Sequence, residues 1–225
     1  MNVVGHDDWI VARKELLAKE KTFTRARDEL TKQRQSLPWE AVETEYAFDG
    51  PNGRETLAEV FDGRSQLVVY HFMFPPEDDA GCPGCSFWAD NFDGIVQHLA
   101  HRDVTMVAIS RAPYPKLAAY EQRLGWSFKW FSSGENEFNY DFGASFRPEQ
   151  RDEPVFNFGT LAPANSDREG ISVFAKEDGA VFRTYSTFAR GIDLTNTAYN
   201  YLDLVPKGRD EDGRGFFWLR RHDEY

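Results

Sequence analysis

The chain has 225 residues, 41% of them hydrophobic, with 26 basic against 37 acidic residues and a formal net charge of −11 at pH 7. Such a negative field repels a phosphate backbone, which argues against nucleic acid as a partner. No apolar run approaches the roughly 20 residues of a membrane span, and the N-terminus lacks the basic start and apolar stretch of a signal peptide. We therefore expect a cytoplasmic protein with a sizeable core and no membrane contact.

The beginning of the chain predicts a helical extension. Apolar residues such as Ile10 and Leu17 recur at helical spacing among charged residues, and Pro38 ends the pattern. This helix is expected to pack on the following domain or on a second copy of the chain, so a homodimer is one expected partner. The expected divisions are the extension at 1–38, a main domain at 39–211 and a C-terminal tail at 212–225.

The sequence of the main domain predicts alternating strands and helices. In chain order we expect a strand at 39–48, a turn at 49–53, a helix at 56–61, a buried strand at 66–74, a helix at 83–101, a strand at 104–109, a helix at 115–124, a strand at 128–132, a hairpin of 171–175 with 180–186, and a helix at 192–204. This succession predicts an α/β fold with a mixed sheet.

Cys82 and Cys85 are the only cysteines, and they stand together as G-C-P-G-C between the predicted strand at 66–74 and the next helix. A Cys-x-x-Cys pair at this junction is typical of a thiol–disulfide redox centre. Helix N–H groups would favour a thiolate at Cys82, and Cys85 one turn later could resolve a mixed disulfide. The acidic loop at 77–79 would oppose that thiolate.

Two other chemistries are open for this pair. The spacing to His98 and His101 approaches that of a zinc finger, but an unbroken helix from 83 to 101 would hold the two ends about 20 Å apart. The pair could also bind another metal ion together with His71, or be inert. No Gly-rich phosphate loop is present, and we expect neither a metal nor a cofactor.

Several motifs together make the chain recognisable. They are H-F-M-F at 71–74, G-C-P-G-C-S-F-W-A-D at 81–90, A-I-S-R-A-P at 108–113, F-N-Y-D-F-G at 138–143, Y-S-T-F-A-R-G at 185–191 and Y-N-Y-L-D-L-V-P-K-G-R-D-E at 199–211. With them the chain resembles a bacterial thioredoxin-like family of predicted dithiol–disulfide oxidoreductases, catalogued as a domain of unknown function. The resemblance implies a thioredoxin-like fold with Cys82 as nucleophile and Cys85 as resolving cysteine, acting on a thiol or disulfide substrate with a thiol electron donor.

The site departs from that of thioredoxin itself. The motif is Cys-Pro-Gly-Cys, Gly81 stands where thioredoxin has a tryptophan, and Arg168-Glu169-Gly170 replaces the cis-proline that normally faces the cysteines. These departures argue against general protein-disulfide reduction. A peroxiredoxin-like peroxide reductase, with Arg111 or Arg183 as its cation, is the alternative enzyme. A ligand-binding module without turnover is the alternative outside enzymes.

Further site residues follow from the same comparison. Laid against the equivalent thioredoxin strand, V-V-Y-H-F places His71 near a buried proton acceptor, so we hypothesise that His71 assists proton transfer at Cys85. The alternative is a histidine hydrogen-bonded within the core. Trp88, Tyr140 and Tyr185 are expected to wall a substrate pocket, or else to pack in the core. Arg111 follows a strand at the sheet edge where ligands tend to bind.

Overall fold

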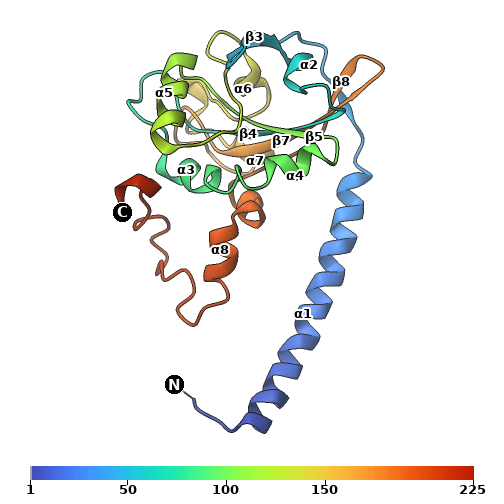
Figure 1. The fold of residues 1–225 in the computed structure, drawn as a ribbon, viewed down its shortest axis with the longest axis vertical. Coiled ribbons are helices and arrows are strands. Elements are labelled where there is room, and N and C mark those ends of the chain that lie inside the picture. The colour runs from blue at the N-terminus through green and yellow to red at the C-terminus, as the bar shows by residue number, and fades with distance from the viewer. Residues whose placement is uncertain (1) are drawn as a thin grey trace. The chain divides into compact units, whose positions relative to one another are not determined.

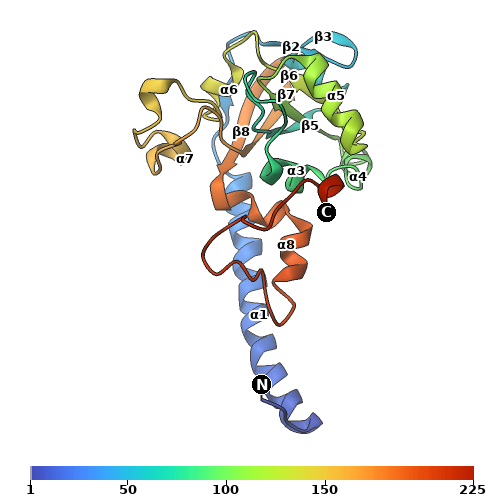
Figure 2. The same ribbon diagram turned by 90° about the vertical axis from the view of Figure 1, so that its left-hand side faces the viewer.

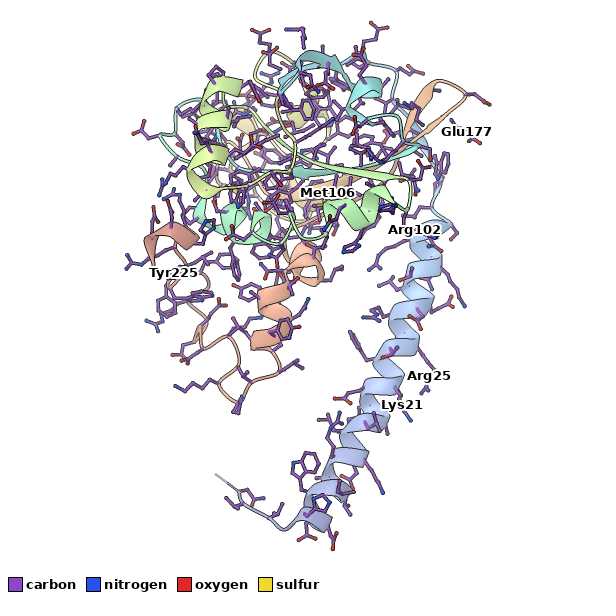
Figure 3. The ribbon with its side chains drawn as sticks, in the orientation of Figure 1. Lys21, Arg25, Arg102, Met106, Glu177 and Tyr225 are labelled. Carbon is purple, nitrogen blue, oxygen red and sulfur yellow. The ribbon has the colours of Figure 1, made fainter. Side chains whose placement is uncertain are left out.

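A computed structural model describes residues 2–225, in two units that meet at Pro38 and Trp39. The first unit contains one 30-residue helix, α1 (His6–Gln35), with acidic side chains in its first turn, basic ones in its last turn and no buried side chain. Those charges complement the helix dipole. Lys21 and Arg25 project from α1 one turn apart (Figure 3).

The second unit is built on one mixed sheet. Its strands are β1 (Glu40–Ala41), β2 (Ala47–Gly50), β3 (Gly53–Thr56), β4 (Gln66–His71), β5 (Val104–Ser110), β6 (Trp130–Ser132), β7 (Gly170–Glu177) and β8 (Ala180–Phe188). They lie in the order β1-β8-β7-β4-β5-β6-β2-β3. β4, β5 and β6 are parallel, and every other pair is antiparallel.

Short helices accompany the sheet, some of them against its faces and others beyond it (Figures 1 and 2). They are α2 (Leu57–Val60), α3 (Pro83–Ala89), α4 (Val96–Ala100), α5 (Tyr114–Leu124), α6 (Phe138–Asp141), α7 (Phe156–Gly159) and α8 (Thr197–Leu202), with the 3-10 helices η1 (Pro148–Gln150), η2 (Ala189–Thr195) and η3 (His222–Glu224). One aromatic core packs α3 and α5 on one face, and a second packs α2 and α6 on the other.

The connections at the centre of the sheet define the fold. β4 leads through α3 and α4 to its parallel neighbour β5, while β7 pairs antiparallel with β4 on the other side and forms a hairpin with β8. This β-α-β unit followed by a β-hairpin, in the order β8-β7-β4-β5, is a thioredoxin-like fold. The predicted α/β class and mixed sheet are therefore confirmed.

The β7–β8 hairpin forms where its turn residues predict it. Asp178 and Gly179 both have positive φ, 51° and 83°. A two-residue turn with left-handed backbone at both positions matches the twist of the flanking strands. β7 extends beyond the predicted 171–175 at both ends, and β8 extends beyond the predicted 180–186 at its C-terminal end.

The predicted helix at 83–101 is wrong in one respect, because it breaks between Ala89 and Val96. Side chains in the break form long-range bonds instead of continuing the helix. Asp93 accepts from the main-chain N–H groups of Ser127 and Phe128, at 3.0 Å each. Asp and Asn side chains that find such partners compete with helical structure.

Two other elements also divide. The predicted strand at 39–48 becomes β1 and β2, which pair with different strands at opposite sides of the sheet. The predicted helix at 192–204 becomes η2 and α8. Asn196 separates them, because its side chain accepts from Tyr199 N–H at 3.0 Å and begins the new helix.

Candidate active site

The two thiols lie at the start of α3, beside the end of β4. Cys82 is the residue before the helix, and Pro83 occupies its first position, where a missing N–H costs nothing. Cys82 is half-buried, whereas Cys85 is 2% exposed, and both are free thiols. The N–H of Met73 donates to Cys85 Sγ at 3.3 Å, so the main chain after β4 contacts the deeper sulfur.

The two sulfurs have opposite electrostatic environments. A hydrogen bond from Cys85, followed by main-chain N–H groups of Cys85 and Gly84, lowers the pKa of Cys82 to about 7 against the effect of burial. Burial, followed by the interaction with Cys82, raises the pKa of Cys85 well above its ordinary value. Near neutral pH the pair can therefore hold a thiolate at Cys82 and a proton at Cys85.

Gly81, which departs from thioredoxin, is explained by close packing. A Cβ at this position would lie 2.7 Å from the Phe72 ring and 3.0 Å from Tyr120. The same residue is held by the C-terminal tail, since Arg221 Nη2 donates to the Gly81 carbonyl at 2.7 Å and Nε donates to the Tyr120 hydroxyl at 2.6 Å. The tail is thus part of the site's framework, as its course beside α3 also shows (Figures 1 and 2).

Cys82 lies where two clefts meet. The first is polar, with a volume of about 520 Å³, and its wall includes Glu77, Asp78 and Arg221. The second, about 590 Å³, has both cysteines and Tyr70 in its wall. Its remaining lining is mainly apolar or charged, with one neutral amide at Asn165: Met73, Pro83, Gly84, Trp88, Asn165, Arg168, Glu169, Ala189, Arg190, Ile192, Asp193, Phe216 and Leu219. We call this second one the Trp88 cavity.

His71 lies on the opposite face of the sheet from the thiols. Successive residues of a strand face opposite sides, and His71 packs on Phe138 of the second core, with ring centroids 5.8 Å apart. Its Nε2 is 2.9 Å from Ser172 Oγ. Burial lowers the pKa of His71 to about 3. This placement corrects the predicted contact with Cys85 and matches the alternative of a core histidine.

Tyr70, the residue before His71, is the strand residue that faces Cys85. It is fully buried and lines the Trp88 cavity, and within the described residues its hydroxyl has no hydrogen-bond partner other than Cys85. Burial, followed by the charge at Cys85, raises the pKa of Tyr70 well above its ordinary value. The phenol thus stays protonated beside the deeper sulfur. Strand alternation was the sequence signal that could have distinguished Tyr70 from His71.

Glu169 is the second residue that sequence reasoning missed. It comes directly before β7, where thioredoxin has its cis-proline, and none of the described peptide bonds is cis. Its negative charge is among the causes that raise the pKa values of both cysteines. Its carboxylate pairs with Arg168 at 3.2 Å. The unusual sequence at this position was visible from the start, but its effect on the thiols was not.

Of the predicted pocket residues, only Trp88 lines the cavity beside the cysteines. Its Nε1 donates to the Ile192 carbonyl at 3.1 Å, which fixes η2 against α3. Arg111 instead pairs with buried Asp167 at 2.7 Å and donates to the Tyr140 hydroxyl at 3.2 Å. Tyr140 and Tyr185 are absent from the walls of both clefts.

No group of three or more His, Cys, Asp and Glu side chains in the described chain is arranged to hold a metal ion. His98 lies in α4 and His101 directly follows it, both exposed. In the same residues, no helix combines the length and apolarity needed to cross a membrane.

The whole chain matches one known protein family. Residues 1–225 match the family described as "Bacterial protein of unknown function (DUF899)". The chain belongs to this family. The match confirms the family resemblance of the sequence motifs, and it extends through the C-terminal tail that clamps Gly81 in this DUF899 member. No curated protein sequence matches the chain.

Solved structures similar to this DUF899 chain include two from peroxide-related proteins. Peroxidoxin BcpB from Mycobacterium tuberculosis is 17% identical over 71% of this chain and 93% of its own, with a TM-score of 0.48. Peroxiredoxin Q from Xanthomonas campestris is 16% identical over 70% and 95%, with a TM-score of 0.47. A hypothetical protein from Sinorhizobium meliloti is 14% identical over 69% and 75%, with a TM-score of 0.44. The strand order, rather than these low identities, defines the thioredoxin-like fold.

Proposed function

We propose that this protein is a thiol–disulfide oxidoreductase in which Cys82 is the nucleophile and Cys85 the resolving cysteine. The observation that carries the proposal is the asymmetry of the pair. Cys82 has a lowered pKa and borders two clefts, while Cys85 lies buried behind it with a raised pKa. A reactive sulfur at the surface with a protonated partner one helical turn away is the arrangement that dithiol exchange needs.

The proposed reaction has two exchange steps. The Cys82 thiolate attacks one sulfur of a substrate disulfide, whose S–S bond breaks and whose other half leaves as a thiol after taking a proton. Cys85 then loses its proton and attacks Cys82 Sγ, which releases the second half and forms the Cys82–Cys85 disulfide. The substrate gains two electrons, and an external dithiol or two thiols return two electrons to the protein.

Tyr70 is proposed to assist the second step. Its hydroxyl faces Cys85 and has no other hydrogen-bond partner in the described chain. When Cys85 ionises, this hydroxyl can donate to the new thiolate in a site from which bulk water is excluded. Hydrogen bonds to charged groups are stronger than those to neutral ones, so the contact would stabilise the attacking form of Cys85.

A single-turnover experiment tests the proposal. Reduced protein, freed of reductant under argon, is mixed with bis(2-hydroxyethyl) disulfide or with hydrogen peroxide. Remaining thiols are then alkylated in acid and counted by mass spectrometry. We expect both thiols to be lost at a rate proportional to disulfide concentration. Cys82→Ser should abolish the loss, while Cys85→Ser should accumulate a mixed disulfide at Cys82 and release the second product thiol roughly 100-fold more slowly.

Peroxide reduction is the second candidate, because a thiolate with a lowered pKa also attacks an O–O bond. In that reaction Cys82 would become a sulfenic acid and condense with Cys85, with loss of water. Faster consumption of thiols by peroxide than by the disulfide would therefore favour the peroxide reductase. Loss of neither thiol with either oxidant would rule out both reactions and leave a binding module.

A further inference from the structure

The Trp88 cavity has the properties of a substrate site for a particular class of molecule. Its volume of about 590 Å³ lies within the range of small-molecule pockets. Trp88 and Ile192 form an apolar wall from the domain, and Phe216 and Leu219 form another from the C-terminal tail. The nucleophilic sulfur of Cys82 lies in the same lining, so an occupant would be held directly against it.

The charged groups in this lining neutralise one another. Arg168 pairs with Glu169 at 3.2 Å, and Arg190 pairs with Asp193 at 3.1 Å. The lining therefore holds two cations and two anions, each in an ion pair, and their formal charges cancel. Asp193 also pairs with Arg209 at 3.2 Å, and the Arg190 side chain is 87% exposed, so solvent screens its charge. The overall charge of −11 further disfavours anionic molecules.

Main-chain groups beside Cys82 are also engaged. Arg168 N–H donates to the Ala144 carbonyl at 2.8 Å, and the Ser166 carbonyl accepts from Phe146 N–H at 2.7 Å. The Gly81 carbonyl is held by Arg221. An extended polypeptide binds by pairing with free main-chain groups, and these three groups cannot serve it.

We infer that the Trp88 cavity binds an uncharged, largely apolar small-molecule disulfide as the substrate of Cys82. This inference rests on the proposed function and adds the substrate class. The apolar halves of the molecule would lie against Trp88 and Phe216, while its S–S bond meets Cys82. Attack then breaks that bond as in the exchange steps above, and Tyr70 lies in the same lining, beside the cysteines.

Matched disulfides test the inference. Dipropyl disulfide and dithiodipropionate have chains of similar length that end in methyl groups or in carboxylates, and insulin supplies polypeptide disulfides. Single-turnover rates with reduced protein are divided by the rate of each disulfide with free N-acetylcysteine amide, which removes differences in intrinsic reactivity. We expect the normalised rate to be roughly tenfold higher for dipropyl disulfide than for dithiodipropionate or insulin.

Two neighbouring phenylalanines provide a matched pair of variants. Phe216 lines the cavity and is 51% exposed, whereas Phe217 is 54% exposed and does not line it. Phe216→Ala should lower the normalised rate with dipropyl disulfide roughly fivefold, and Phe217→Ala should leave it unchanged. Leu219→Ala should act in the direction of Phe216→Ala, which separates loss of the wall from a local disturbance of the tail.

The outcomes distinguish a failure of the inferred substrate class from a failure of the proposed exchange reaction. Equal normalised rates for all three disulfides, or equal effects of Phe216→Ala and Phe217→Ala, would overturn the substrate class while leaving the exchange reaction intact. A preference for insulin would overturn it in favour of a polypeptide. If Cys82→Ser reacted with these disulfides as fast as the unmodified protein, the proposed function itself would fail.

Discussion

Cys82 at the mouth and Cys85 at the floor of the candidate active site are three residues apart in sequence and differ in exposure and in the direction of their pKa shift. At the mouth, Cys82 borders two clefts and its pKa is lowered by hydrogen bonds from Cys85 and from the main chain. At the floor, Cys85 is 2% exposed, packs among aromatic rings and has its pKa raised by burial. One helical turn therefore separates two identical side chains into a thiol with a lowered pKa and a thiol with a raised pKa, the asymmetry on which the proposed roles rest.

The largest expected effect is the difference in reactivity between these two sulfurs. With limiting iodoacetamide at pH 7, Cys82 should be alkylated faster than Cys85 by roughly two orders of magnitude, because only its thiolate is substantially populated. Thiolate forms above the pKa, so the Cys82 rate should rise roughly tenfold between pH 6 and pH 8 with a midpoint near 7. Peptide mapping by mass spectrometry measures both rates. Equal labelling of the two cysteines would remove the basis of the comparison.

The next largest expected effect concerns Cys85 alone and tests the proposed role of Tyr70. Tyr70→Phe keeps the ring that packs on Phe92, with centroids 5.1 Å apart, and removes only the hydroxyl. We expect the second exchange step to slow roughly tenfold, since a hydrogen bond to a charged sulfur is lost, while the Cys82 alkylation profile stays unchanged. Stopped-flow release of the second product thiol measures the step.

His71→Gln is the matched control, because this neighbour lies on the other face of the sheet. Its exchange rates should equal those of the unmodified protein. A slower second step in His71→Gln, with no change in Tyr70→Phe, would restore His71 as the proton acceptor and remove Tyr70 from the mechanism.

The smallest expected effect concerns the negative charge of Glu169, which acts on both sulfurs. Glu169→Gln removes a negative charge that raises both cysteine pKa values, so the pKa of Cys82 should fall. Alkylation of Cys82 at pH 6 should then rise roughly threefold, with little change at pH 8 where the thiolate already predominates. Asp78→Asn, in the exposed loop of the polar cleft, is the control and should leave the rate at pH 6 unaltered. The reverse result would assign the tuning charge to the acidic loop.

The sequence predicted elements whose signals are local. The apolar run of β4, the turn at Asp178-Gly179 and the position of Cys82 before a helix each depend on a few neighbouring residues, and each is present. The break after Ala89 depends instead on partners far along the chain, such as Asp93 with Ser127. The pattern of apolar residues within 83–101 gives no sign of these distant partners.

The candidate site shows the same difference between local signals and partners that are distant in sequence. Cys82 and Cys85 were predicted from their spacing, but the strand residue beside them was misassigned by one position, which moves a side chain to the opposite face of a sheet. Arg221 and Phe216 reach the site from the C-terminal tail, more than 130 residues beyond the cysteines in sequence. Their contribution comes from tertiary packing, and sequence spacing contains no record of it.

The hydrogen bond from Arg221 to the Gly81 carbonyl also affects which reagents can bind beside Cys82 and react with it. Because the carbonyls of Gly81 and Ser166 and the N–H of Arg168 are already hydrogen-bonded, a peptide-based electrophile cannot pair with these three groups beside Cys82. If the proposed substrate class is right, a compact, uncharged electrophile with an aromatic or alkyl body would instead enter between Trp88 and Phe216 and reach Cys82 Sγ. Such a compound is the natural starting point for an activity-based label selective for this protein in a cell extract.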